Sequence, residues 1–250
     1  MRDISSQIYS PARISKRRKQ IKEILSRSIP VAVFSIKDGI VMITKNKRPE
    51  PKIFTVHNRV AVGAIGNYEE IQEMRTTLIS DSLVIEMMYS PKDVSAEVIA
   101  KGLSSLLKDN FYNVLYKPFE IELAIAQVNE KQEEDQIFYV SFDGRITESR
   151  IVIVGSEYQK KEENNNSDNG EKDDRSEILK IFDELKSQYS SNLSSLSSQD
   201  VLKIIMDMMD KNENEIAGQS MQSAVWEIKL LDRRKLGENE EFEDILTVLR

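Results

Sequence analysis

The amino-acid sequence predicts an α+β protein, a four-layer αββα sandwich in which two antiparallel sheets pack face to face between helix pairs. Three observations favour this fold class. Blocks of β-rich runs alternate with helix-like segments along the chain. Asp-Gly pairs join neighbouring β-rich runs, which is typical of hairpins in antiparallel sheets. Runs such as AVFSI and IVMIT lack polar alternation, as expected for sheets that are covered on both faces.

The first predicted elements are two β-hairpins, formed by Val31–Ile36 with Ile40–Thr44 and by Ile53–Val56 with Val60–Ile65. In the first turn, Gly39 supplies the positive φ that a tight turn requires. The second turn contains His57, which we expect to be exposed to solvent. These hairpins provide four of the strands that the sandwich needs.

Helices and further strands follow the hairpins. Asn67 is the expected N-cap of a helix that runs to about Tyr89, with Glu70 in the capping-box position. Pro91 interrupts the helical pattern. The remaining predicted elements are a helix at Ala96–Leu107, strands at Phe119–Val128, Gln136–Phe142 and Ile146–Val154, helices at Ile178–Tyr189 and Asp200–Met209, a strand at Ala224–Leu231 and a closing helix at Glu240–Leu249.

Composition excludes several functional classes. The 250 residues contain no cysteine and one histidine, which excludes disulfides, a thiolate nucleophile, zinc–thiolate sites and a histidine metal cluster. No run approaches the roughly 20 apolar residues of a membrane helix, and the basic N-terminal segment lacks a signal-peptide apolar region. We therefore expect a soluble, cytoplasmic protein that needs no metal or cofactor.

Charge is unevenly distributed along the chain. Residues 1–27 carry a net charge of +6, which leaves −13 for the remaining 223 residues. Apolar side chains recur within this basic segment at roughly helical spacing, at Ile14, Ile21, Ile24 and Leu25. We interpret the segment as a helix that docks by its apolar stripe. Nucleic-acid binding is the alternative, although Tyr9 is the only aromatic side chain there that could stack on a base.

A second shift in composition lies between Ser156 and Glu177. This run contains eight acidic and four basic residues, one aromatic residue and no aliphatic residue. Such a segment cannot bury enough apolar surface to offset the entropy lost on ordering. We expect a disordered acidic insertion at residues 157–176.

Five segments carry a resemblance to a known family. They are VAVFSIKDGIVMITK, KIFTVHNRVAVGAIGNYEE, KPFEIELAIAQV at Lys117–Val128, FYVSFDGRI at Phe138–Ile146, and VIVG at Val152–Gly155. Their order and spacing resemble the proteasome subunit family, from about Tyr9 to Leu249, and KPFEIELAIAQV is most similar to the α subunits of bacterial, actinobacterial-type proteasomes. The resemblance implies the N-terminal-nucleophile hydrolase fold, which is the predicted sandwich.

The resemblance also separates catalytic from non-catalytic members of the family. Active β subunits use an N-terminal threonine whose own α-amine acts as base, assisted by an Asp and a Lys. With the first hairpin aligned, Ile29 stands at the threonine position and Lys45 at the Asp position, so only the Lys, at Lys52, remains. The sequence thus resembles a non-catalytic α-type subunit rather than an enzyme, with no catalytic residue of its own.

Two other function classes stay open. One is a divergent N-terminal-nucleophile hydrolase, a β-like or HslV-like peptidase that would be cleaved before Ser28. Ser28 is one residue from the nucleophile position and has no accompanying Asp. The other is a stand-alone α/β binding module whose basic segment holds nucleic acid.

The α-type resemblance implies a division of the chain into three parts. Residues 1–10 would be a gating tail, residues 11–27 the N-terminal α-subunit helix, and residues 28–250 the sandwich domain. The residues implied at the gate and its turn are Asp3, Tyr9, Ser10 and Pro11. The Tyr-Asp-Arg signature of archaeal and eukaryotic gates is absent, because the sequence reads Arg2-Asp3-Ile4.

Two further residues match an activator-binding pocket of α subunits. Lys52 matches a lysine that pairs with the C-terminal carboxylate of a ring ATPase, and Gly66 matches a glycine of the same pocket. Without the resemblance they would be an exposed loop lysine and a helix-start glycine. The implied partners are other copies of the chain in a heptameric ring, β-type subunits and a ring-shaped AAA ATPase, with no membrane and no nucleic acid.

Overall fold

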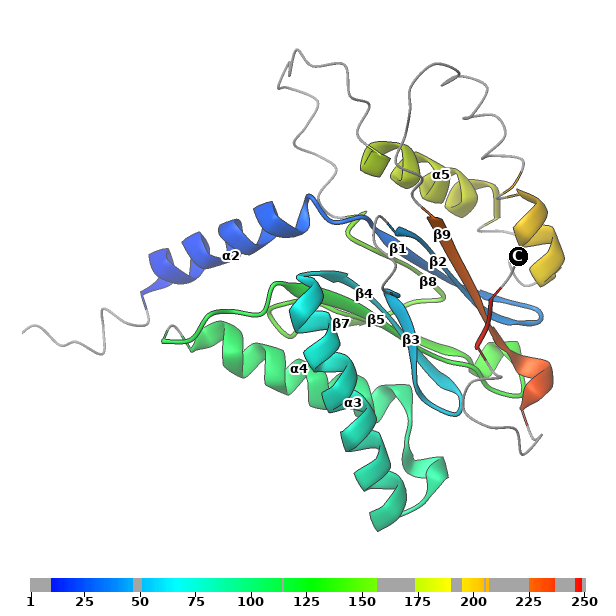
Figure 1. Ribbon diagram of the computed structural model, residues 1–250, viewed down its shortest axis with the longest axis horizontal. Coiled ribbons are helices and arrows are strands. Elements are labelled where there is room, and N and C mark those ends of the chain that lie inside the picture. The colour runs from blue at the N-terminus through cyan, green and yellow to red at the C-terminus, as the bar shows by residue number, and fades with distance from the viewer. Residues whose placement is uncertain are drawn as a thin grey trace, which may run out of the picture.

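The computed structural model describes residues 10–46, 51–113, 115–156, 174–189, 195–204, 206, 225–236 and 246–248. Within them, two five-stranded antiparallel sheets lie between helices (Figure 1). Sheet A has the order β10-β9-β2-β1-β8, formed by Leu246–Val248, Val225–Asp232, Gly39–Asn46, Val31–Ile36 and Ile151–Val154. Sheet B has the order β3-β4-β5-β6-β7, formed by Ile53–His57, Val60–Gly66, Ile121–Gln127, Gln136–Val140 and Ile146–Glu148.

Three hydrophobic layers confirm the predicted four-layer arrangement. Helices α3 (Tyr68–Met88) and α4 (Ala96–Tyr112) pack on sheet B through a buried cluster that includes Met74, Leu103 and Leu123. Helix α5 (Asp174–Tyr189) and the helical residues 198–204 cover sheet A through a layer that contains Phe34 and Phe182. The third layer lies between the two sheets. Figure 1 shows α3 and α4 on one side of the sheets and α5 on the other.

Helix α2 (Pro11–Leu25) confirms the predicted N-terminal helix. Ser10 is its N-cap, and its hydroxyl accepts a hydrogen bond from the backbone N–H of Arg13 at 3.4 Å. Pro11 stands in the first turn, where its fixed φ suits a helix start. Ile21 and Leu25 are buried and enter the layer between the sheets. The apolar stripe therefore anchors α2 to the sandwich.

The β1–β2 hairpin and the start of α3 form largely as predicted. Gly39 has φ +152° in the Asp-Gly turn, and Asn67 caps α3 by accepting from the N–H groups of Glu69 and Glu70. The second half of the capping box is absent. The carboxylate of Glu70 instead binds the ammonium of Lys117 at 2.8 Å, because residues 117–120 pass beside the helix start.

Two of the predicted elements are wrong. The run Ile146–Val154 is two strands, because the chain turns at Ser149–Arg150 and crosses from sheet B to sheet A. Arg150 fixes this crossing by donating to the carbonyl oxygens of Gln132 and Glu133. The closing helix is also wrong where the structure describes it: residues 246–248 form β10 and pair with Lys229–Leu231 of β9. The β-branched Thr247 and Val248 suit a strand better than a helix.

Two boundary and burial expectations also need correction. Helix α5 begins at Asp174, so residues 174–176 of the expected insertion are helical, and residues 157–173 lie outside the described part. Arg175 is buried there because its guanidinium donates to the carbonyl oxygens of Ser28 (2.9 Å) and Gly155 (2.7 Å). His57 is 1% exposed rather than open to solvent, since its ring packs beneath α3 and contacts Glu86 at 3.3 Å.

Among the described helices, none is long and apolar enough to cross a membrane.

Candidate functional site

Lys52 lies immediately before β3, at the end of the sandwich where β1 begins. Its side chain is half-buried, and its Nζ lies 3.5 Å from the carbonyl oxygen of Ile29. Its own carbonyl oxygen accepts from the N–H of Ala64 at 3.0 Å, which aligns the start of β3 with β4. Lys52 is therefore held beside Ile29, the residue that the resemblance aligns with the nucleophile.

Gly66 is the last residue of β4, at the end of sheet B where β3 begins. The β3–β4 register pairs Ile53 with Gly63, so Lys52 lies opposite Ala64, two residues before Gly66. Gly66 has φ +119°, and a Cβ atom there would lie 1.9 Å from the carbonyl oxygen of Glu120. The structure thus places the two predicted pocket residues on neighbouring stretches of chain. The requirement for glycine at this position also has a local explanation, because this chain's own backbone fills the space that a side chain would take.

Residues 117–120 connect Gly66 with helix α2. The backbone N–H of Asn67 donates to the carbonyl oxygen of Glu120 at 3.0 Å. Glu70 binds both Lys117 and the N–H of Glu120, and its hydrogen bond raises the pKa of Lys117 above the ordinary lysine value. This segment is thus fixed to the start of α3 and forms one wall beside α2.

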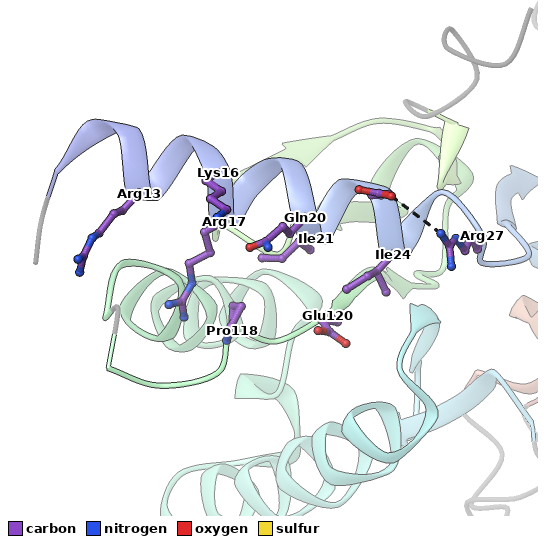
Figure 2. A pocket seen from close by; sticks show the side chains of 10 residues that line it. Arg13, Lys16, Arg17, Gln20, Ile21, Ile24, Arg27, Pro118 and Glu120 are labelled. Atoms are coloured by element: carbon purple, nitrogen blue, oxygen red, sulfur yellow. Dashed lines mark ion pairs between the residues drawn. The ribbon is translucent and has the colours of Figure 1, made fainter. Parts of the chain in front are cut away.

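A groove of about 570 Å³ runs between α2 and this wall (Figure 2). Four cationic side chains, two carboxylates and a short apolar floor surround it. The lining residues are Arg13, Lys16, Arg17, Gln20, Ile21, Glu23, Ile24, Arg27, Pro118 and Glu120. The groove therefore presents a net positive charge beside the Gly66 edge, which suits an anionic group.

Two arginines of α2 are engaged within the chain. Arg17 donates to the carbonyl oxygens of Asn110 (3.1 Å) and Tyr116 (2.7 Å), and burial lowers the pKa of its guanidinium. Arg18 pairs with Asp143 at 3.2 Å, and its guanidinium lies over the ring of Phe111. Part of the basic charge of residues 1–27 thus fastens α2 to the body of the protein, as the docked-helix interpretation requires.

The position that the resemblance aligns with the nucleophile holds an apolar side chain, Ile29. Ile29 is buried, and its peptide link runs back through the half-buried Ser28 to α2. The ammonium of Lys45, which stands at the family's Asp position, lies 5.9 Å from the ring centroid of Trp226. The two positions that the resemblance aligns with the nucleophile and its Asp therefore carry neither a hydroxyl nor a carboxylate.

The predicted gate residues are described only in part. Ser10 and Pro11 form the start of α2, whereas Asp3 and Tyr9 lie outside the described residues.

Sequence reasoning missed the residues that support Lys52 from the other sheet. Glu227 and Lys229 of β9 contact the first residues of β3 through hydrogen bonds. Their signal was present, because two charged residues with a spacing of two interrupt the apolar run AVWEIKLL and must share one face of a strand. What the sequence alone could not supply was the strand order that brings β9 to the start of β3.

Comparisons with known proteins agree with the resemblance. The family model described as "Proteasome subunit" matches residues 31–210. A proteasome subunit alpha of Arthrobacter sp. (strain FB24) is 30% identical over 164 residues, which cover 63% of this chain and 68% of that protein. A proteasome subunit alpha of Paenarthrobacter aurescens is 32% identical over 159 residues, which cover 61% of this chain and 66% of that protein. The chain thus matches about two thirds of the length of these relatives.

Proposed function

Because the chain belongs to the proteasome subunit family, we propose that it is a non-catalytic α-type subunit of a proteasome core particle. The observation that carries this proposal is the docking of α2, whose Ile21 and Leu25 are buried in the layer between the two sheets. An N-terminal nucleophile requires that the residues before the first strand be removed, whereas here the helix before Ile29 forms part of the core. Cleavage before Ser28 would remove both side chains from the layer between the sheets.

In this role the chain forms an outer ring that caps rings of β-type subunits. Helix α2 projects beside the sandwich, as Figure 1 shows, and Ile24 on its surface is 42% exposed. An exposed apolar side chain among cations suits contact with a neighbouring copy of the chain. Residues 1–10, which precede the fixed start of α2, are the proposed gating tail that controls access to the proteolytic chamber.

The ring also docks a ring-shaped AAA ATPase or another activator. Lys52 provides a single ammonium for the activator's terminal carboxylate, and the groove beside α2 extends a positive surface from the Gly66 edge. The position of Lys52 opposite Ala64, two residues before Gly66, supports this assignment. In the cytoplasm, such docking would couple substrate unfolding to degradation.

Peptide hydrolysis with and without a partner tests the non-catalytic role. The purified chain alone should not hydrolyse fluorogenic peptides, and co-expression with a threonine-bearing β-type subunit should produce activity that a variant lacking the β-subunit threonine loses. Intact mass spectrometry should show that the chain is not cleaved before Ser28. Activity of the chain alone together with a new N-terminus at Ser28 would instead identify a hydrolase.

A further inference from the structure

Strand β3 is an edge strand of sheet B as described, and its first residues have partners that do not belong to the sheet. An edge strand leaves outward N–H and C=O groups without a neighbouring strand. At Ile53 the N–H donates to the Oε1 atom of Glu227 at 3.3 Å, and the carbonyl oxygen accepts from Nζ of Lys229 at 2.6 Å. Two side chains of β9, in the other sheet, thus take the place of a strand.

Glu227 also binds the backbone of Lys52 itself. The N–H of Lys52 donates to Oε2 of Glu227 at 3.0 Å, and Asn46 Nδ2 donates to the same oxygen at 2.5 Å. Lys229 pairs with Oε1 at 2.9 Å, and the two charged side chains are only 10% and 15% exposed. Hydrogen bonds to a charged acceptor in such a position are stronger than neutral ones, so this carboxylate fixes the backbone around Lys52 firmly.

The contacts hold the main chain of Lys52 from two sides. Its carbonyl oxygen is bound by Ala64 of β4, and its N–H is bound by Glu227 of β9. The ammonium of Lys229 balances the charge of Glu227, so the carboxylate adds little net negative potential beside the lysine. The direction in which Lys52 leaves the backbone is therefore set jointly by the two sheets.

We propose that Glu227 and Lys229 are positioning residues for carboxylate capture by Lys52. The inference rests on the proposed docking function of Lys52. A single ammonium binds a carboxylate more tightly when its side chain is already held in place, because less side-chain conformational entropy is lost on binding. Without the pair from β9, the ammonium of Lys52 is displaced from the approaching terminal carboxylate.

The test measures how much of peptide affinity depends on a terminal carboxylate. Short N-acetylated peptides ending in Leu, Phe or Tyr, each as the free acid and as the amide, are titrated onto the chain assembled with its β-type partner. The wild-type complex should bind the acid about tenfold more tightly than the amide, the factor that one charge-assisted hydrogen bond provides. K52A should abolish this preference, and E227Q should abolish most of it.

Matched variants separate positioning from stability. D232N removes the charge of another buried carboxylate on β9, paired with Arg234 at 2.7 Å at the other end of the strand, and should keep the wild-type preference. K229R keeps a donor for the carbonyl oxygen of Ile53 and should retain the preference for the acid. K229M removes that donor and should lower the preference, which provides a second test if E227Q does not fold. In the double variant K52A/E227Q, the second substitution should not weaken acid binding further.

Two results would overturn the inference in distinguishable ways. If K52A abolishes the preference but E227Q and K229M retain it, Lys52 docks the carboxylate without the pair from β9. If the wild-type complex itself does not distinguish acid from amide, the docking function of Lys52 fails, and the positioning role fails with it.

Discussion

The surroundings of Gly66 and His57 restrict which side chain each position can hold, and the sequence pattern does not reveal these restrictions. Gly66 was expected in a binding pocket, and it lies two residues beyond Ala64, the partner of Lys52. Its positive φ and the carbonyl oxygen of Glu120 already demand glycine. His57 was expected in an open turn, and it is buried beside Glu86. Neither environment follows from neighbouring residues, because both depend on segments that lie far away in the sequence.

Replacement of Gly66 by alanine should destabilise the protein. The added Cβ atom would meet the carbonyl oxygen of Glu120 in a backbone conformation that alanine rarely adopts, so we expect a loss of at least about 2 kcal/mol in the free energy of unfolding. Urea titration measures the change. The matched control is Gly102→Ala in α4, where nothing lies within 4 Å of the new atom. That substitution should stabilise by about 0.5–1 kcal/mol, and equal effects at both positions would refute the local explanation.

Stability should depend on the titration of His57. Desolvation by burial lowers the pKa of its imidazole below the ordinary value of 6.5, although Glu86 opposes this shift and Arg59 adds to it. The unfolded chain therefore binds a proton more readily, and stability is lost as pH falls from 6.5 through the lower folded pKa.

A histidine-free variant isolates this contribution. Unfolding free energies of wild type and His57→Gln are compared between neutral pH and the acid side of the histidine range. The difference in unfolding free energy between wild type and His57→Gln should shrink as the pH falls. Only the wild type loses the part of its stability that depends on a neutral His57. A difference that stays constant with pH would contradict the assignment.

At the scale of elements, local sequence signals predicted most helices and strands. They failed where the structure of a segment depends on which strand it pairs with. The Asp-Gly turn, the Asn67 cap and the apolar stripe of α2 are encoded by adjacent residues, and the structure contains each of them. The run Ile146–Val154 reads as one strand but serves both sheets, and residues 246–248 become β10 because β9 offers a free edge. The role of Glu227 was invisible for the same reason.

The N-terminal tail and helix α2 should be separable in function. Deletion of residues 1–9 removes most of the proposed gating tail. The N-cap Ser10 remains, so α2 should stay folded. Peptide hydrolysis by the complex with β-type subunits should then increase several-fold, because the proposed gate is gone. The full-length variant Ser10→Ala weakens the cap, at a cost of about 1 kcal/mol, without removing the tail. It should not raise hydrolysis, and unchanged hydrolysis after the deletion would remove the gate assignment.

At the scale of the whole molecule, the sequence specified the layers because each sheet is covered on both faces. Apolar runs without alternation predicted that coverage, and the structure has three hydrophobic layers between its four structural ones. The charge division also has a structural meaning. The basic segment becomes a helix that is fastened to the body through Ile21, Leu25, Arg17 and Arg18, and that leaves a positively charged groove beside it.

Native mass tests whether the chain forms a ring that caps rings of β-type subunits. Mass spectrometry under non-denaturing conditions is applied to the chain alone and to the chain co-expressed with a threonine-bearing β-type subunit. We predict a closed oligomer that contains several copies of the chain, with β-type subunits joined to it when they are present. A chain that remains monomeric in both preparations would contradict the proposed ring.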